Sequence, residues 1–88
     1  MDWSKYSFVI RAKNRKAVLL CLSKPKTPTQ LAEELKLSLP HVSRALKELE
    51  KEGLVECLTP SEKVGRVYKR TKIGEEIVNF VKSELKEE

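Results

Sequence analysis

The side chains best suited to binding chemistry in this 88-residue chain are a small polar and basic group: His41, Ser43, Arg44 and Lys47. No acidic residue interrupts them. A guanidinium group can donate two hydrogen bonds to O6 and N7 of guanine, and basic and hydroxyl groups bind phosphate oxygens. This combination favours nucleic-acid binding. Arg44 suits either a base or a phosphate, whereas Lys47 is better suited to a phosphate.

The same stretch carries apolar residues at helical spacing. Val42, Leu46 and Leu49 recur at intervals of four and three, so they lie on one side of a helix predicted over Leu39–Glu52. The basic residues point away from that side. A helix that is apolar on one face and cationic on the other, braced by a shorter helix before it, fits the major groove of DNA.

Local signals mark the ends of both helices. Thr27 and Gln30 can form a capping box, and Pro28 stands at the first helical position, where its missing N–H is tolerated. Ser38 is a suitable N-cap for the second helix. Gly53 follows the last periodic residue, as a glycine that terminates a helix does. These signals predict a helix-turn-helix.

A β-hairpin is predicted directly after the glycine. Strands are expected at Leu54–Leu58 and Arg66–Arg70, because both runs are β-prone. The residues between them include a proline, a serine and a glycine, which are typical of a loop. The chain is therefore expected to be mainly α-helical with a β-hairpin wing.

Two further helices are predicted on either side of this central part. Asn14 is expected to cap a helix over Arg15–Ser23, and Thr71 a helix over Lys72–Lys86. The inward-facing residues expected in the earlier helix are Ala17, Val18, Cys21 and Leu22. The apolar stripe of the last helix consists of Ile73, Ile77, Val78, Phe80, Val81 and Leu85.

The first residues are harder to classify. Trp3, Tyr6, Val9 and Ile10 fit a helical stripe, although the run from Phe8 to Ile10 is β-prone. We expect a helix or an irregular arm that packs against a partner subunit. The whole chain is short enough to be one domain. Its expected parts are the N-terminal arm or helix (1–13), the helix-turn-helix (27–52), the wing hairpin (54–70) and the C-terminal helix (72–86).

The charge distribution favours a polyanionic partner. The net charge is +5. Seven Lys or Arg and no acid lie between Trp3 and Ala32, and five more, again without an acid, between Lys63 and Lys72. Residues 75–88 instead hold five acids against two lysines. The positive charge therefore lies on the body of the chain, as expected of a protein that binds nucleic acid.

Other classes of site lack the residues they need. Cys21 and Cys57 are far apart in a chain with no CxxC pair and one histidine, which argues against a zinc site or a disulfide framework. We expect reduced, buried thiols in a cytoplasmic protein. No catalytic His–carboxylate pair, nucleophile elbow or phosphate-binding glycine loop is present. We therefore expect no enzyme, cofactor or metal, and no run approaches the ~18 apolar residues that span a bilayer.

Three segments together resemble a known family. The sequences NRKAVLLCLSKPKTPTQ, LAEELKLSLPHVSRALKELEKEGLVE and GRVYKRTKIGEEI are similar to winged helix-turn-helix transcriptional regulators of the ArsR/MarR type, and most of all to archaeal members with short chains. The resemblance runs from about Arg11 to Ile77. One departure is Lys36, which stands where the family often has glycine. A lysine can adopt the left-handed conformation there at a cost of about 1 kcal/mol.

The resemblance implies a sequence-specific regulator that binds double-stranded DNA. Helix 39–52 would enter the major groove, and the wing, residues 59–66, would contact the flanking backbone or minor groove. The residues that the resemblance and the wing place at the DNA surface are Ser38, Pro40, His41, Ser43, Arg44, Lys47, Lys63 and Arg66. A homodimer is expected through the N-terminal segment and the C-terminal helix.

Two alternatives remain open at this stage. The same fold can dock another protein and leave its DNA face idle, although acid-free runs at both the second helix and the wing disfavour this. A metal or redox sensor could use Cys21 and Cys57, but the cysteine cluster of ArsR-type metal sensors is missing.

Overall fold

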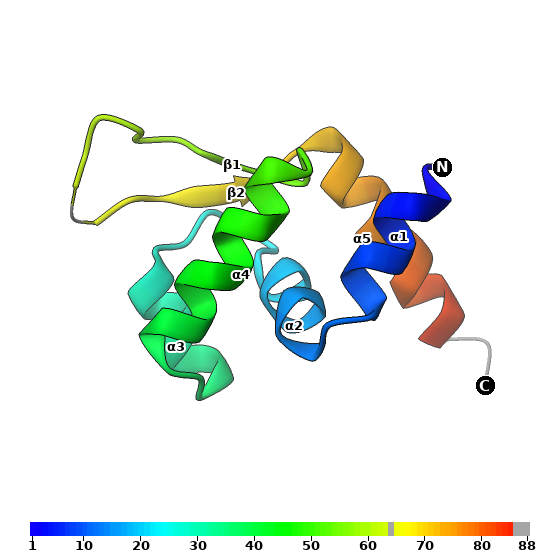
Figure 1. The fold of residues 1–88 in the computed structure, drawn as a ribbon, viewed down its shortest axis with the longest axis horizontal. Coiled ribbons are helices and arrows are strands. Elements are labelled where there is room, and N and C mark those ends of the chain that lie inside the picture. The colour runs from blue at the N-terminus through cyan, green and yellow to red at the C-terminus, as the bar shows by residue number, and fades with distance from the viewer. Residues whose placement is uncertain (64, 86–88) are drawn as a thin grey trace.

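The computed structural model, which describes residues 1–63 and 65–85, has a helical body from one end of which a β-hairpin extends (Figure 1). The predicted architecture, mainly α-helical with a hairpin wing, is confirmed. In chain order the elements are α1 (Trp3–Ile10), α2 (Lys13–Cys21), α3 (Pro28–Leu35), α4 (Leu39–Lys51), β1 (Val55–Cys57), β2 (Tyr68–Arg70) and α5 (Lys72–Leu85).

The core lies where α4 packs against α2 and α3. The apolar side predicted for α4 is buried, and Ala45 joins it. Burial of a leucine or valine side chain contributes about 1.5–3 kcal/mol, so this face holds the helix in place. The buried apolar residues are Val9, Val18, Leu19, Leu22, Leu31, Val42, Ala45, Leu46, Leu49, Leu54, Val55, Tyr68, Ile77, Val78 and Val81.

The predicted capping signals fix the ends of α3 and α4. The Thr27 hydroxyl accepts a hydrogen bond from the Gln30 amide (3.2 Å), and the Gln30 side chain accepts one from the Thr27 amide (2.9 Å), which completes the capping box. Lys36 ends α3 in the left-handed conformation with φ of 57°. Ser38 then caps α4 by accepting from the His41 amide (3.4 Å). Gly53 follows α4 with φ of 77°.

The two strands are shorter than predicted. A third segment, which the sequence did not predict to be extended, pairs with β2. β1 and β2 pair antiparallel, with Val55 opposite Arg70 and Cys57 opposite Tyr68. Lys26, before α3, forms a bridge with Tyr68 through N–O distances of 3.0 and 2.9 Å. Leu54, predicted to begin the strand, is buried instead in the core. The hairpin is thus tied to the helix-turn-helix on its β2 side.

The predicted start and inward face of α2 were partly wrong. The helix begins at Lys13 after an N-cap residue, Ala12, that makes no side-chain cap; Asn14 lies inside the helix. Leu19 is buried, whereas Ala17 and Cys21 are only half-buried. The reason is tertiary: α2 is covered by α1, α3, α4 and α5, so more than one of its faces is in contact.

The first ten residues, for which the sequence allowed a helix or an irregular arm, contain a helix, α1. Asp2 caps α1 by accepting from the Ser4 and Lys5 amides at 3.0 and 3.2 Å. Val9 is buried in the core of its own chain. Residues Trp3 and Tyr6 each pack edge-on against Phe80 of α5, and the Tyr6 hydroxyl donates to Glu84. In Figure 1 α1 and α5 lie together at the side of the body away from α3.

α5 begins as predicted, and part of its apolar stripe is buried. The Thr71 hydroxyl caps the helix as expected, accepting from the Gly74 amide at 3.2 Å. Ile77, Val78 and Val81 are buried, whereas Ile73, in the same predicted apolar stripe, is 41% exposed. It lies in the first turn, beyond the edge of the core. The side chain of Leu85 and the whole of Lys86, also predicted in this helix, lie outside the described residues.

Candidate nucleic-acid interface

The outer face of α4 is a row of exposed residues. Pro40, Arg44, Lys47 and Lys51 follow one another at intervals of three and four, opposite the buried face of the same helix. In the part of the chain that the structure describes, no carboxylate forms an ion pair with Arg44 or Lys47. Their charges are therefore available to a ligand.

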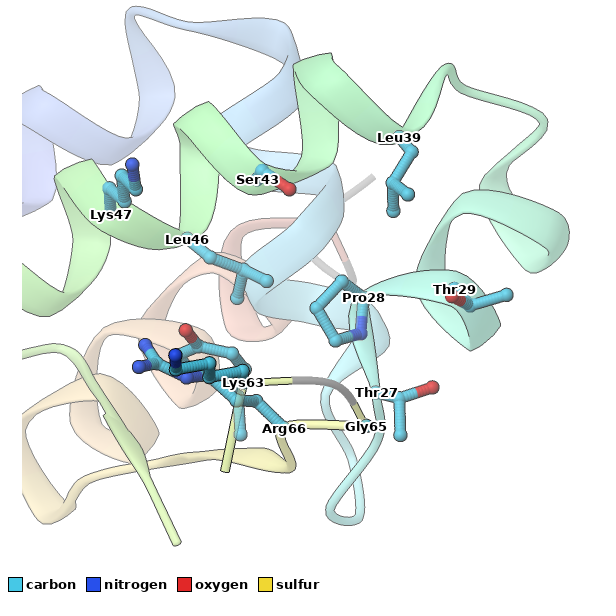
Figure 2. A pocket seen from close by; sticks show the side chains of 11 residues that line it. Thr27, Pro28, Thr29, Leu39, Ser43, Leu46, Lys47, Lys63, Gly65 and Arg66 are labelled. Atoms are coloured by element: carbon cyan, nitrogen blue, oxygen red, sulfur yellow. The ribbon is translucent and has the colours of Figure 1, made fainter. Parts of the chain in front are cut away.

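A cleft of about 460 Å³ separates this helix from the wing (Figure 2). Ser43 and Lys47 approach it from α4, and Lys63 and Arg66 from the wing. The N-terminus of α3 closes the third side. The structure thus brings together four of the predicted residues from two segments about 20 positions apart in the chain.

Arg66 is partly used to shape the wing. Its Nε donates to the Glu62 carbonyl at 2.6 Å and its Nη2 to the Pro60 carbonyl at 3.4 Å. The nearby Tyr68 phenol raises the pKa of Arg66. The guanidinium thus holds the wing loop through two of its N–H groups.

His41 and Arg44 lie on the other flank of α4. They line a second cleft, of about 350 Å³, together with Ala45, Glu48 and the first turn of α2. Arg15 from that turn is committed within the protein. Its Nε lies 3.6 Å from Glu48 Oε1, and its guanidinium lies 3.8 Å from the ring centroid of Phe8.

The predicted residues therefore form three groups. Ser38 and Pro40 are exposed at the start of α4, with the Ser38 hydroxyl used as a cap. His41 and Arg44 face the α2 side, and the remaining four face the wing side. Lys51 was not among the predicted residues, but it is exposed four positions after Lys47 and continues the same row along the helix.

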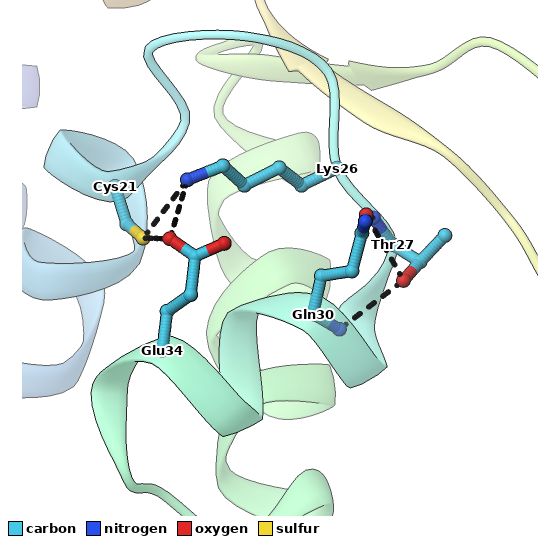
Figure 3. Close-up of polar contacts among 5 residues, drawn as sticks. All are labelled: Cys21, Lys26, Thr27, Gln30 and Glu34. Carbon is cyan, nitrogen blue, oxygen red and sulfur yellow. Dashed lines mark hydrogen bonds and ion pairs between the residues drawn. The ribbon is translucent and has the colours of Figure 1, made fainter.

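A separate polar cluster surrounds Cys21 (Figure 3). The Lys26 ammonium donates to Glu34 (2.7 Å) and to the Cys21 sulfur (3.5 Å), and the thiol donates to Glu34 (3.4 Å). Burial and the hydrogen bond to Glu34 raise the pKa of Cys21, while Lys26 lowers the pKa of Glu34. Cys21 and Cys57 are both free and half-buried, rather than fully buried as expected.

Comparison with known proteins identifies the family. Residues 11–56, half of the chain, match the family described as winged helix-turn-helix DNA-binding. The chain belongs to this family. The resemblance found in the sequence is thus confirmed at the level of the winged helix-turn-helix. No curated protein matches the chain.

Solved structures with the same fold include DNA-bound and regulatory proteins. TubR bound to 24 bp of tubC from Bacillus thuringiensis serovar israelensis has a TM-score of 0.79 and 18% identity, covering 92% of this chain and 91% of that chain. A MarR family transcription regulator has a TM-score of 0.75 and 26% identity, and the match covers 92% of this chain and 58% of that chain. Lactococcus lactis ZitR has a TM-score of 0.74 and 22% identity, and the match covers 82% of this chain and 51% of that chain.

The winged-helix chain described here spans about half the length of the ZitR and MarR-family structures. These similarities show the winged-helix fold and its use in transcription regulators. None of the helices in the described residues has the length and apolar character needed to cross a membrane.

Proposed function

We propose that this winged-helix chain is a sequence-specific transcriptional regulator that binds double-stranded DNA. α4 lies in the major groove, and the wing, residues 59–66, follows the flanking backbone or minor groove. The observation that carries the proposal is that Arg44 and Lys47 are exposed on the outer face of α4, with Lys63 and Arg66 of the wing lining the same cleft as Lys47.

The individual roles follow from exposure and neighbours. Arg44 is exposed on the outer face of α4 and reads a guanine edge or binds a phosphate. His41 beside it contacts the same strand. Ser43 and Lys47 bind phosphate oxygens on the wing side, while Lys63 and the outward N–H groups of the wing arginine approach the flanking backbone or minor groove.

Ser38 and Pro40 serve this surface by position. The Ser38 hydroxyl oxygen accepts from the His41 amide as the cap of α4, which leaves its O–H free to donate to a phosphate oxygen. Pro40 lies in the first turn, exposed, where its ring can lie against the groove wall.

A salt series tests the proposal. Each phosphate neutralised contributes about −0.9 to the slope of log K against log salt, so four contacts in each subunit of a dimer give a slope of roughly −7. Binding to random-sequence duplex DNA should be measured for the wild type, Lys47→Ala and Lys63→Ala. Each variant is expected to bind DNA more weakly. The slope should become shallower by about 0.9 for each phosphate contact that the protein loses.

Lys24→Ala is the matched control, since Lys24 is an exposed lysine between α2 and α3 that lines neither cleft and lies outside the proposed dimer helices. It should leave both affinity and slope nearly unchanged. No binding at low salt would refute the regulator and favour a winged-helix module that binds a protein instead. An equal effect of all three lysine substitutions would refute the proposed surface.

We further propose a homodimer through α1 and α5. Trp3 of α1 is 59% exposed beside Phe80 of α5, and Ile10 at the end of α1 and Met1 just before it are exposed apolar residues as well. A two-fold dimer places two recognition helices about 34 Å apart on a near-palindromic site. Sedimentation equilibrium should give a dimer that Trp3→Ser weakens; a wild-type monomer at micromolar concentration would refute this.

A further inference from the structure

Leu39 is unusual on the proposed DNA surface because it is large, apolar and 47% exposed. It is the first residue of α4, directly after the Ser38 cap. Figure 2 shows its side chain at the mouth of the wing cleft, on the same side of the helix as Leu46 and near Pro28 of α3. Pro28, Leu46 and Tyr68 also line this cleft, and Ser43, Lys47, Lys63 and Arg66 supply its polar and basic groups.

This position is where a recognition helix contacts bases. In helix-turn-helix proteins the N-terminal residues of the second helix reach the base edges in the major groove. Leu39 is therefore nearer the bases than residues later in α4. Ser43 and Lys47, one and two turns further along, are placed to hold the phosphates of the adjoining strand.

The chemistry of the groove limits what Leu39 can contact there. Among the groups that the four bases present in the major groove, the C5-methyl of thymine is the apolar one; the others donate or accept hydrogen bonds. Placing leucine against those polar groups would leave them without partners, at a cost in binding. A thymine methyl instead removes apolar area from water on both sides.

We propose that Leu39 is a specificity-determining residue that packs against the C5-methyl group of a thymine in the bound site. This inference rests on the proposed function, because it names one base that the same surface reads. It adds a preference that the basic residues do not supply, since they bind phosphates or guanine.

Replacing thymine by deoxyuridine is the direct test, because it removes the methyl group and leaves base pairing intact. A preferred duplex is first selected from random sequence with the wild-type chain. Each thymine is then replaced singly, and binding is measured at fixed salt. At one position or its symmetry mate, the wild type is expected to lose about fourfold in affinity, the value of one buried methyl group.

The Leu39→Ala variant tests whether the preference for thymine comes from Leu39. It is expected to bind the thymine and deoxyuridine duplexes equally, because its methyl group is too short to reach the base. Ile73→Ala is the control, as Ile73 is similarly exposed (41%) but lies on α5 outside the cleft. This control should keep the fourfold preference for thymine.

The outcomes separate the two proposals. A wild-type chain that binds its selected duplex but responds to no thymine replacement overturns the role of Leu39 and leaves DNA binding intact. Retention of the thymine preference by Leu39→Ala overturns it as well. A wild-type chain that selects no duplex overturns the proposed function together with this inference.

Discussion

Replacing Gly74 by alanine tests how closely α5 packs on the hairpin. A Cβ atom at this position would lie 2.2 Å from the Leu54 carbonyl oxygen, 3.2 Å from the Leu54 carbonyl carbon and 3.5 Å from Arg70 Cβ. The carbonyl cannot simply turn away, because it accepts the Thr71 amide at 3.0 Å. The start of α5 must therefore move away from the residue that precedes β1.

The expected magnitude comes from two opposing effects. In an exposed helix, alanine is more favourable than glycine by about 1 kcal/mol. Against this, relieving a 2.2 Å contact to beyond 3.0 Å requires a shift of the backbone at the start of α5. Overpacking of this kind costs typically about 1–3 kcal/mol, and a clash with backbone belongs at the upper end. The net loss in the free energy of unfolding is expected to be about 1–2 kcal/mol.

Urea unfolding followed by circular dichroism measures this change. Ser83→Ala is the matched control, because Ser83 is exposed on the same helix and its replacement should raise stability by no more than about 0.5 kcal/mol. A Gly74→Ala chain as stable as the wild type, or more stable, would refute the close packing of α5 on Leu54. An unchanged midpoint with a changed slope would point to the denatured state instead.

Three further changes test local features of the helix-turn-helix. Thr27→Ala removes the capping box and is expected to lower the free energy of unfolding by about 1 kcal/mol in urea titrations; no loss would mean that the cap contributes nothing. Lys36→Gly relieves a left-handed lysine and should raise stability by up to about 1 kcal/mol by the same measurement, whereas a loss would show that lysine is not strained there. Glu34→Gln should lower stability at neutral pH, because Lys26 lowers the pKa of Glu34 and the ionised pair stabilises the fold above the ordinary carboxylate pKa. That difference should disappear as the pH falls through the lowered pKa of Glu34; a difference that persists in acid would refute the ion pair as its cause.

The sequence alone predicted most of the helix-turn-helix. The capping box at Thr27 and the cap at Ser38 both involve groups within four positions of each other. Such signals depend on local backbone geometry. For the same reason the apolar face of α4 could be predicted, since it follows from a period of 3.6 residues.

The contacts that could not be predicted join segments far apart in the chain. Arg15, a basic residue at the predicted start of a helix, is held inside the protein by Glu48 and Phe8. The strand around Tyr68 is supported by Lys26, over forty residues earlier. Neither contact leaves a pattern in the nearby sequence.

The chain by itself therefore determined the order of helices, the wing, the buried side of α4 and the types of residue available to bind DNA. Only the tertiary structure decided how those residues are grouped. It placed Arg44 on the α2 flank and Lys47 with Lys63 on the wing flank, and it left Leu39 exposed at the mouth of the wing cleft. The physical reason is that spacing along a helix sets the direction of a side chain, whereas packing between elements sets its neighbours.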